Sequence, residues 1–284
     1  MKIRVLGSAA GGGFPQWNCN CRNCDGVRHG RIHARARTQS SIAVTVNDVD
    51  WLLVNASPDI LAQIGGSSSL QPGRSPRDTG IVAVALMDAQ IDHVTGLLML
   101  REGRQLSIHC TASVWKDLTE GLALTRVLSH YCDLQWQPIE MNDAATPRDG
   151  KPFMLAQLDG AEFIPIPLSS KAPPYSTNRM SPSPGDNIGL LIRNSHTGRS
   201  AFYAPGLGRI DPHVASVMKA ADTVLVDGTF WHDDEMIRLG LSTKTAADMG
   251  HLPQAGSGGM IELLDSLGAR RKILIHINNT VLSH

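Results

Sequence analysis

Short runs of β-branched and apolar residues recur along almost the whole chain, and glycine, proline, asparagine or aspartate bounds each run. This pattern is typical of strands that are separated by turns. The predicted strands cover residues 3–7, 41–46, 51–56, 81–86, 106–110, 162–168, 188–193, 201–204, 223–228 and 272–277. Ten predicted strands indicate a large sheet content.

Apolar residues at helical spacing appear between several of these runs. They predict helices over residues 94–103, 115–128, 211–221 and 258–268. The early strands follow one another closely, whereas the later strands alternate with helices. We therefore predict an α/β (α+β) fold in which two mixed sheets pack face to face and helices lie outside them.

Three stretches rich in glycine, serine and proline are predicted to be loops. They cover residues 65–80, 141–152 and 169–187. The segment 169–187, which contains Tyr175, Arg179 and Asp186, is either a lid over a functional site or a passive surface loop. The chain shows neither an internal repeat nor a linker that splits it, so we predict a single domain over residues 1–284.

Composition narrows the classes of function. The 284 residues are 42% hydrophobic and 18% charged, which is too apolar for disorder. The formal net charge is zero, and no charged run indicates binding to nucleic acid or to a membrane surface. No window reaches the roughly 18 apolar residues of a membrane helix, and the glycine-rich start does not resemble a signal peptide. We expect a cytoplasmic protein with a small ligand.

Three of the five cysteines lie within six residues. The stretch NCNCRNC contains Cys19, Cys21 and Cys24. Thiolates at this spacing can converge on one tetrahedral zinc ion, whereas disulfides use so tight a cluster poorly. We predict a structural zinc-binding turn over residues 19–24, and the alternative is three inert thiols. The fourth ligand stays open, because His29 and His33 are near but a distant residue can also fold back.

Polar residues stand where several apolar runs end. Asp92 and His93 follow the run 81–86, whereas Asp227 and His276 lie within the last two residues of later runs, and His251 lies in a loop flanked by glycine and proline. A polar side chain at such a place is costly unless it binds or hydrogen-bonds something. The alternative is that these residues serve as helix caps and ordinary buried polar groups.

Taken together, the motifs resemble those of a known family. They are AAGGGFPQWNCNCRNC, NASPDI, DAQIDHVTGLL, FYAPGLG, LVDGTFWHDDE, MGHLPQ and LIHINNT, and they span residues 9–280. These motifs are similar to those of the coenzyme pyrroloquinoline quinone (PQQ) biosynthesis protein B family, in the metallo-β-lactamase superfamily. The resemblance implies an αββα sandwich with its metals on loops at one edge of the two sheets.

The superfamily motif His-x-His-x-Asp-His is only half present. Asp88 and Gln90 stand at its first two histidines, whereas Asp92 and His93 match its last two residues and His276 matches the final superfamily histidine. The other two ligands, a histidine and a bridging aspartate, have no counterpart. Two histidines and one carboxylate with open positions suit non-haem Fe(II), whereas dinuclear hydrolysis needs two ions roughly 3.5–4 Å apart. We predict a mononuclear Fe(II) site.

The resemblance implies an iron-dependent hydroxylase of PQQ biosynthesis that uses O2 to oxidise the tyrosine ring of a Glu-Tyr-derived dipeptide. One alternative is a PQQ carrier involved in transport, and another is residual phosphodiesterase or lactonase activity. Asp88 and Gln90 are expected to orient ligands or metal-bound water. Asp227 and His251 are candidates for acid-base catalysis or substrate contact. The oligomeric state is open, and a homodimer is one option.

This sequence departs from related cyclic phosphodiesterases that have the same three cysteines. Those proteins place a zinc-binding histidine three residues after their last motif histidine, and here that position is Asn279. The sequence also ends at His284, where family members usually continue, so we expect a C-terminal strand to be absent or altered.

Overall fold

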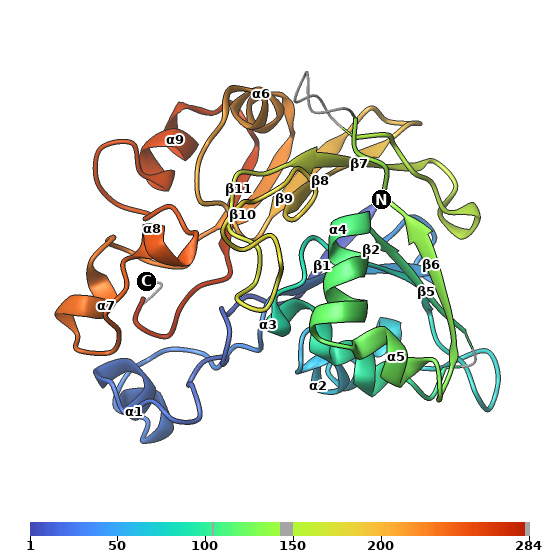
Figure 1. Cartoon of the computed structure of the whole chain (residues 1–284), viewed down its shortest axis with the longest axis horizontal. Helices are drawn as coiled ribbons and strands as arrows, with labels where there is room; N and C mark the ends of the chain where they lie inside the picture. The colour runs from blue at the N-terminus through green and yellow to red at the C-terminus, as the bar shows by residue number, and fades with distance from the viewer. Residues whose placement is uncertain (104, 143–149, 282–284) are drawn as a thin grey trace.

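The computed structural model describes residues 1–103, 105–142 and 150–281. Within them, eleven strands form two sheets (Figure 1). The first sheet has the order β1 (Lys2–Gly7), β2 (Ser41–Thr45), β3 (Trp51–Val54), β4 (Ile81–Ala85), β5 (Gln105–Cys110) and β6 (Asp133–Pro138). The second has the order β11 (Arg271–Ile275), β10 (Thr223–Asp227), β9 (Ser200–Ala204), β8 (Ile188–Asn194) and β7 (Ala161–Pro167).

Both sheets are mixed. The pairs β1–β2, β2–β3, β7–β8 and β8–β9 are antiparallel, and the pairs from β3 to β6 and from β9 to β11 are parallel. The predicted fold class is confirmed, and each predicted strand is present. Because neighbouring parallel strands end at the same edge of a sheet, the loops after them gather side chains from distant parts of the sequence.

Strand β6 was not predicted, because its sequence DLQWQP alternates polar and apolar residues and contains no continuous apolar run like those of the predicted strands. It lies at the end of the first sheet and pairs in parallel with β5. The ring of Trp136 stacks on that of Trp115, with 5.2 Å between the ring centroids. Pairing with β5 and stacking of the two indole rings therefore stabilise a partly buried strand that has no apolar run.

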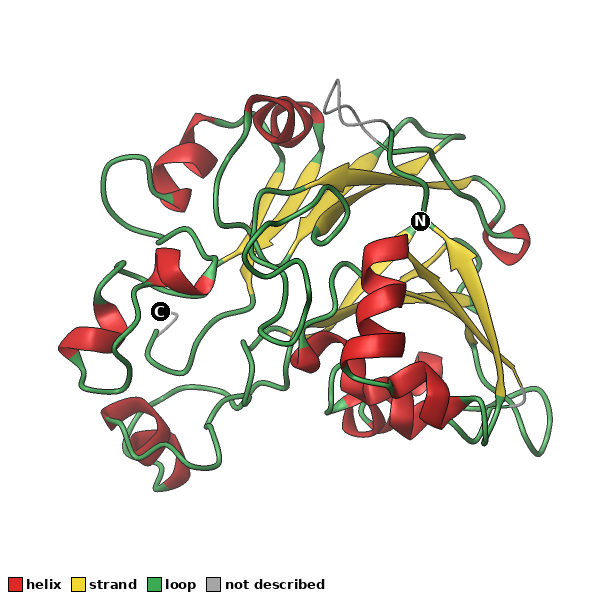
Figure 2. Cartoon of the chain, in the orientation of Figure 1, coloured by secondary structure: helices red, strands yellow, loops and turns green. Residues whose placement is uncertain are grey.

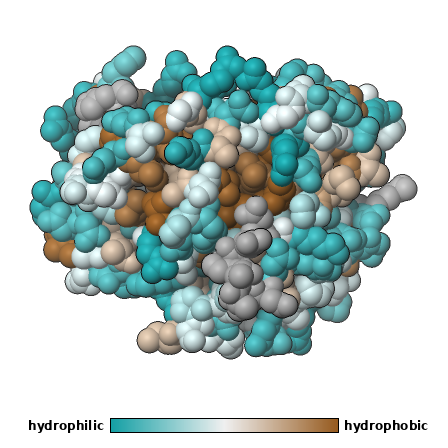
Figure 3. All heavy atoms as spheres, turned by 90° about the horizontal axis from the view of Figure 1, so that it is seen from above, coloured by the Kyte–Doolittle hydropathy of each residue, from teal (hydrophilic) through white to brown (hydrophobic). Residues whose placement is uncertain are grey.

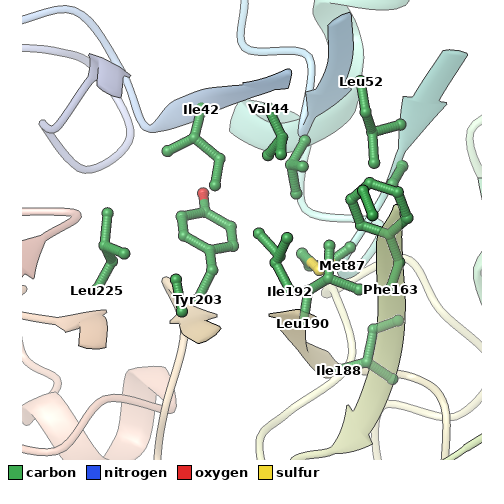
Figure 4. Close-up of a cluster of buried hydrophobic side chains, with 14 of the residues drawn as sticks. Ile42, Val44, Leu52, Met87, Phe163, Ile188, Leu190, Ile192, Tyr203 and Leu225 are labelled. Atoms are coloured by element: carbon green, nitrogen blue, oxygen red, sulfur yellow. The ribbon is translucent and has the colours of Figure 1, made fainter. Parts of the chain in front are cut away.

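The main core lies between the two sheets (Figure 4). Ile42, Val44 and Leu52 of the first sheet face Phe163 and Tyr203 of the second, and all five are almost completely buried. These positions alternate with residues on the opposite faces of their strands, as side chains of a strand must. This packing fixes how the strand ends of the two sheets meet.

Helices cover the outer faces of both sheets (Figure 2). The first sheet is covered by α2 (Ile60–Gly65), α3 (Ile91–Val94), α4 (Ala112–Lys116) and α5 (Leu124–Leu128). The second sheet is covered by α6 (Pro212–Ala220) and α9 (Met260–Ser266). Three further helices, α1 (Arg22–Arg28), α7 (Glu235–Arg238) and α8 (Ala246–Met249), lie in the long connections.

Two of the predicted helices differ from the structure. The predicted helix 94–103 is instead the single turn α3 followed by a 3-10 helix, Thr95–Leu100. The predicted helix 115–128 is interrupted by a π-helical segment, Asp117–Gly121, and by Ala123, which has a left-handed backbone with φ 55°. The apolar spacing of both segments agrees with their helical structure, but packing against the sheet changes the type of helix. Helices α1, α2, α7 and α8 were not predicted, since none exceeds seven residues.

The outer surface is mostly hydrophilic in the view from above, with apolar residues near the middle of that face (Figure 3). Across the described residues, no helix has both the length and the apolar character needed to cross a membrane. Of the predicted loop 141–152, residues 143–149 lie outside the described part of the chain.

A short N-terminal segment joins the two sheets. Ala9 forms isolated bridges with both Gln39 and Ile277. The N–H of Ala10 donates to the carbonyl of Ile277 at 3.0 Å, and the N–H of Ile277 donates to the carbonyl of Ser8 at 2.8 Å. The chain just after β11 is therefore held against the glycine-rich segment near the N-terminus.

Candidate metal centre

The predicted site residues lie where strands of both sheets end. Asp92 and His93 lie in α3, which follows β4. Asp227 is the last residue of β10, and His276 directly follows β11. His276 has φ 56°, a left-handed backbone that is uncommon for residues other than glycine and that often occurs at functional sites.

Asp92, His93 and His276 meet at one point. The Oδ2 atom of Asp92 lies 3.1 Å from Nε2 of His276 and 4.0 Å from Nε2 of His93. One potential ligand atom from each of the three residues lies within 4.8 Å of the others. The fold therefore brings together residues 184 positions apart in the sequence.

His93 is oriented by a neighbouring carboxylate. Its Nδ1 lies 2.8 Å and 2.9 Å from the two oxygens of Asp88, so the Nδ1–H donates to Asp88. Its Nε2 is buried and has no hydrogen-bond partner. A buried nitrogen left without a partner costs free energy, and a metal ion bound by His93 Nε2, His276 Nε2 and Asp92 would remove this cost. The donor set therefore fits a metal ion.

His276 is oriented from its other ring nitrogen. Its Nδ1 lies 2.9 Å from Oγ1 of Thr229, and the hydroxyl of Thr229 lies 2.5 Å from Oδ1 of Asp227. Hydrogen bonds of this kind fix the tautomer and ring orientation of metal-binding histidines. Thr229 thus links the end of β10 to the histidine that follows β11.

Asp227 also holds His251. Nδ1 of His251 donates to Oδ2 of Asp227 at 2.6 Å, and the N–H of Leu207 donates to the same oxygen at 2.9 Å. Asp227, His251 and His276 form a second group whose ligand atoms lie within 4.8 Å of one another. However, both oxygens of Asp227 already accept hydrogen bonds, so this arrangement favours the orientation of His251 over metal binding.

Burial and charge shift the pKa values in opposite senses. Burial alone would lower the pKa of His93, but the Asp88 and Asp92 carboxylates raise it to about 9. Burial would raise the pKa of Asp92, but His93 and His276 hold it well below its usual range. In the same way, Asp227 outweighs burial and raises the pKa of His251. Without a metal, the site therefore favours paired opposite charges.

Gln90 makes a different contact from Asp88. Its side-chain Nε2 lies 3.4 Å from the carbonyl of Lys171, in the segment 169–187. Tyr175 of the same segment donates its hydroxyl to the carbonyl of Ala89. This segment therefore packs on the loop between β4 and α3, beside the candidate site.

Two residues of the site were not predicted. A Cβ added at Gly11 would lie 3.3 Å from Oδ2 of Asp92, so the backbone there approaches the carboxylate closely. Thr229 holds His276 as described. Their only sequence signals were the run of three glycines before the cysteines and the short Asp-Gly-Thr stretch at the end of β10.

The three cysteines of the turn 19–24 also come together, with their sulfur atoms within 4.8 Å of one another. Cys21 is the N-cap of α1, and Cys24 is buried inside that helix. Of the nearby histidines, His29 pairs with Asp25 at 3.0 Å. The side chain next to the sulfurs is instead that of Asn279, from the end of the described chain.

Two facing mixed sheets with a metal-capable His-Asp cluster at their shared edge define a protein of the metallo-β-lactamase superfamily. Residues 50–277 match the family described as Beta-lactamase superfamily domain. The chain is 63% identical over 279 residues to coenzyme PQQ synthesis protein B of Cupriavidus necator, covering 98% of this chain and 89% of that one. The chain belongs to the coenzyme PQQ synthesis protein B family.

Further relatives agree with this assignment. The Azoarcus sp. (strain BH72) protein of the same name is 59% identical, with 99% of this chain and 90% of that one covered. The crystal structure of Zn(2+)-bound PqqB from Methylobacterium extorquens matches with a TM-score of 0.86 at 33% identity, covering 99% of this chain and 90% of that one. A diphosphatase of the PhnP family, with a TM-score of 0.68 and 15% identity over 98% of this chain and 87% of that one, shares the fold.

Proposed function

We propose that this protein is a non-haem Fe(II)-dependent hydroxylase of PQQ biosynthesis that acts in the cytoplasm on the tyrosine ring of a Tyr-containing dipeptide. The observation that carries the proposal is the single cluster of Asp92, His93 and His276, with Nε2 of His93 buried and free of any protein partner. Two histidines and one carboxylate with remaining open positions are the donor set of Fe(II) oxygenases. A bound Fe(II) supplies redox chemistry with O2 that zinc lacks.

The residues around the cluster favour one metal over two. Asp88 and Gln90 stand where a hydrolytic site has its first two histidines, but Asp88 hydrogen-bonds His93 and Gln90 contacts Lys171. Asp227 already accepts bonds from Leu207, Thr229 and His251. A second ion would have to displace these contacts, so dinuclear hydrolysis is disfavoured.

We assign His251 the task of holding or moving a proton near the tyrosine hydroxyl. Its Nδ1 is bonded to Asp227, so Nε2 is the nitrogen left for substrate. Its ring stacks on that of His276 with 5.3 Å between centroids, which places it next to the metal ligands. An imidazole oriented by a buried carboxylate is suited to general acid-base chemistry.

The segment 169–187 is proposed to exclude water from the bound dipeptide. It lies against the loop between β4 and α3 through Tyr175 and Lys171. Arg179 donates to the carbonyl of Ala172, and Asp186 accepts from Asn178, so these side chains stiffen the segment itself. A segment tied to the site loop on one side can act as a lid.

The test is single-turnover hydroxylation under controlled metal loading. Anaerobically purified protein loaded with Fe(II) and mixed with a Tyr-containing dipeptide and a two-electron reductant such as ascorbate should, on addition of O2, give a product heavier by one oxygen atom in mass spectrometry, while the reductant and two protons convert the second oxygen atom to water. Asp92→Asn and His276→Ala should abolish this product, whereas His29→Gln, on the exposed side of α1, should not change it.

Zinc-loaded protein is the matched control, because zinc has no redox chemistry. An unmodified dipeptide after O2 addition to protein that demonstrably holds Fe(II) would contradict the hydroxylase proposal. Tight binding of finished PQQ by the triple variant of Asp92, His93 and His276 would instead favour a carrier.

A further inference from the structure

The turn 19–24 has three cysteine sulfurs and needs a fourth ligand to close a structural zinc site. The side chain of Asn279 reaches this position from the opposite end of the sequence. Its Nδ2 lies 3.1 Å from the sulfur of Cys19, 3.7 Å from that of Cys21 and 3.4 Å from that of Cys24. One terminal atom is thus nearly equidistant from all three sulfurs.

These distances match those of a tetrahedral metal site. With Zn–S bonds near 2.3 Å and Zn–O bonds near 2.0–2.2 Å, the oxygen at the fourth corner lies roughly 3.5 Å from each sulfur. The terminal atom of Asn279 therefore lies at distances expected for the fourth corner. A side chain that only hydrogen-bonds one thiol would approach that sulfur and leave the others further away.

The structure holds Asn279 in this place with separate contacts. Its side chain is almost fully buried. Asn23, which lies between two of the cysteines on α1, donates its Nδ2 to the carbonyl of Asn279 at 3.2 Å and to that of Thr280 at 2.8 Å. In Figure 1 the C-terminal part of the chain runs beside α1 in agreement with these bonds. The helix that carries Cys24 thus fixes the backbone of the fourth residue.

We propose that the carboxamide oxygen of Asn279 is the fourth ligand of a Cys3Asn zinc site. Nitrogen and oxygen of an amide occupy nearly equivalent positions, so rotation of the amide about χ2 exchanges Nδ2, which faces the free thiols, for Oδ1. The oxygen has the lone pairs that a metal needs, whereas the NH2 group only donates.

This ligand connects the two metal-binding regions of the protein. Asn279 lies three residues after His276, and Ile277 between them is paired with Ser8 and Ala10. Zinc at the turn 19–24 therefore clamps the segment that positions His276, one of the residues assigned to the other centre. Loss of this zinc should loosen His276 even though the two sites share no ligand.

Two substitutions, the first of them isosteric, distinguish a metal ligand from a hydrogen-bond donor. In Asn279→Asp, a carboxylate oxygen takes the fourth corner but no N–H remains, so zinc binding, measured by competition with a chromogenic chelator, should be at least as tight as in the natural protein. In Asn279→Ala the corner is lost, and affinity should fall tenfold or more. Asn18→Asp is the matched control, because it adds the same charge to the exposed part of the cysteine turn.

Cobalt spectroscopy gives an independent readout. Asn279→His should retain the metal and shift the visible bands of the Co(II)-loaded site, because a nitrogen replaces an oxygen among the ligands. Zinc affinity that is unchanged in Asn279→Ala would overturn the proposal. A loss of affinity in Asn279→Asp as large as that in Asn279→Ala would also overturn it. The latter result would show that Asn279 only donates to zinc-bound thiolates while water completes the site.

Discussion

At the scale of single residues, the candidate metal centre depends on hydrogen bonds that engage Nδ1 of each histidine and leave its Nε2 facing the proposed metal position. Asp88 occupies Nδ1 of His93, and Thr229 occupies Nδ1 of His276. Both Nε2 atoms are therefore directed toward Asp92. Asp88 stands at a position where hydrolases of the superfamily carry a metal-binding histidine, and in this chain its carboxylate instead holds Nδ1 of His93, one of the proposed ligands.

Substitution of Asp88 tests this role. Asp88→Asn removes the negative charge that favours the Nδ1–H tautomer of His93, so metal affinity at this centre should fall by about 10- to 100-fold. The measurement is titration with Mn(II) or anaerobic Fe(II) by calorimetry. Asp78→Asn, near the opposite end of β4, is the control and should leave affinity unchanged. Equal affinities in both variants would show that Asp88 does not orient His93.

A second prediction at this scale concerns the close approach of Gly11 to Asp92. Its Cβ position lies 3.3 Å from Oδ2 and 3.5 Å from Cγ of Asp92. Gly11→Ala should therefore push the Asp92 carboxylate away from His276 and weaken metal binding several-fold, while the melting temperature of the metal-free protein stays nearly constant. Gly65→Ala, where a Cβ meets nothing within 4 Å, is the control. Metal affinity that is the same in both variants would count against this steric role.

At the scale of elements, the short helix α8 places His251. Thr245 and Asp248 form a capping box at its N-terminus, and Gly250 ends it with φ 91°. His251 follows at once, and its N–H donates to the carbonyl of Ala246. A helix of four residues has little stability of its own. The two caps therefore hold α8 in place, and with it the position from which His251 contacts Asp227.

Removal of the cap should affect His251 without removing the metal. Thr245→Ala should cost about 1 kcal/mol of local stability and raise the hydrogen-exchange rates of the amides of residues 246–251. Turnover should fall while metal content stays at the natural level, since none of the three proposed metal ligands lies on α8. Thr243→Ala, at an exposed threonine in the preceding loop, is the control. Metal loss in Thr245→Ala would show that α8 supports the ligands themselves.

At the scale of the whole molecule, aromatic stacking joins the two sheets. His109 at the end of β5 stacks on Phe153 with 4.9 Å between centroids, and Phe153 stacks on Phe163 of β7. Burial lowers the pKa of His109 from its ordinary value of 6.5 to about 4. The imidazole is therefore neutral when the two sheets are packed.

Stability should consequently depend on pH through His109. Between pH 6.5 and about 4 the unfolded chain takes up a proton that the folded protein excludes, so the free energy of unfolding decreases as the pH falls, by up to about 3 kcal/mol. Urea unfolding of metal-free protein at pH 7.5 and pH 5 measures this. His109→Gln should reduce the difference between the two pH values, and the exposed His130→Gln should not. Identical pH dependence in all three proteins would contradict the assignment.

The sequence by itself determined the class of fold and singled out most of the residues that meet in the candidate site. Short β-branched and apolar runs bounded by turn residues predicted ten strands, because strands buried between a second sheet and helices consist mostly of apolar residues. Residues such as Asp92 and His276 could be singled out because a polar group at the end of an apolar run needs a partner. Strand β6 was missed, since it has only the alternating Leu134 and Trp136 where the other strands have an apolar run.

Only the tertiary structure decided which of these residues act together. The contact of Asp92 with His276 and that of Asn279 with the cysteines each join residues more than 180 positions apart. Such contacts depend on the order of strands in two sheets and on how the sheets face each other. Local preference does not contain that information, because a hydrogen bond between distant residues leaves no periodic signal in the chain.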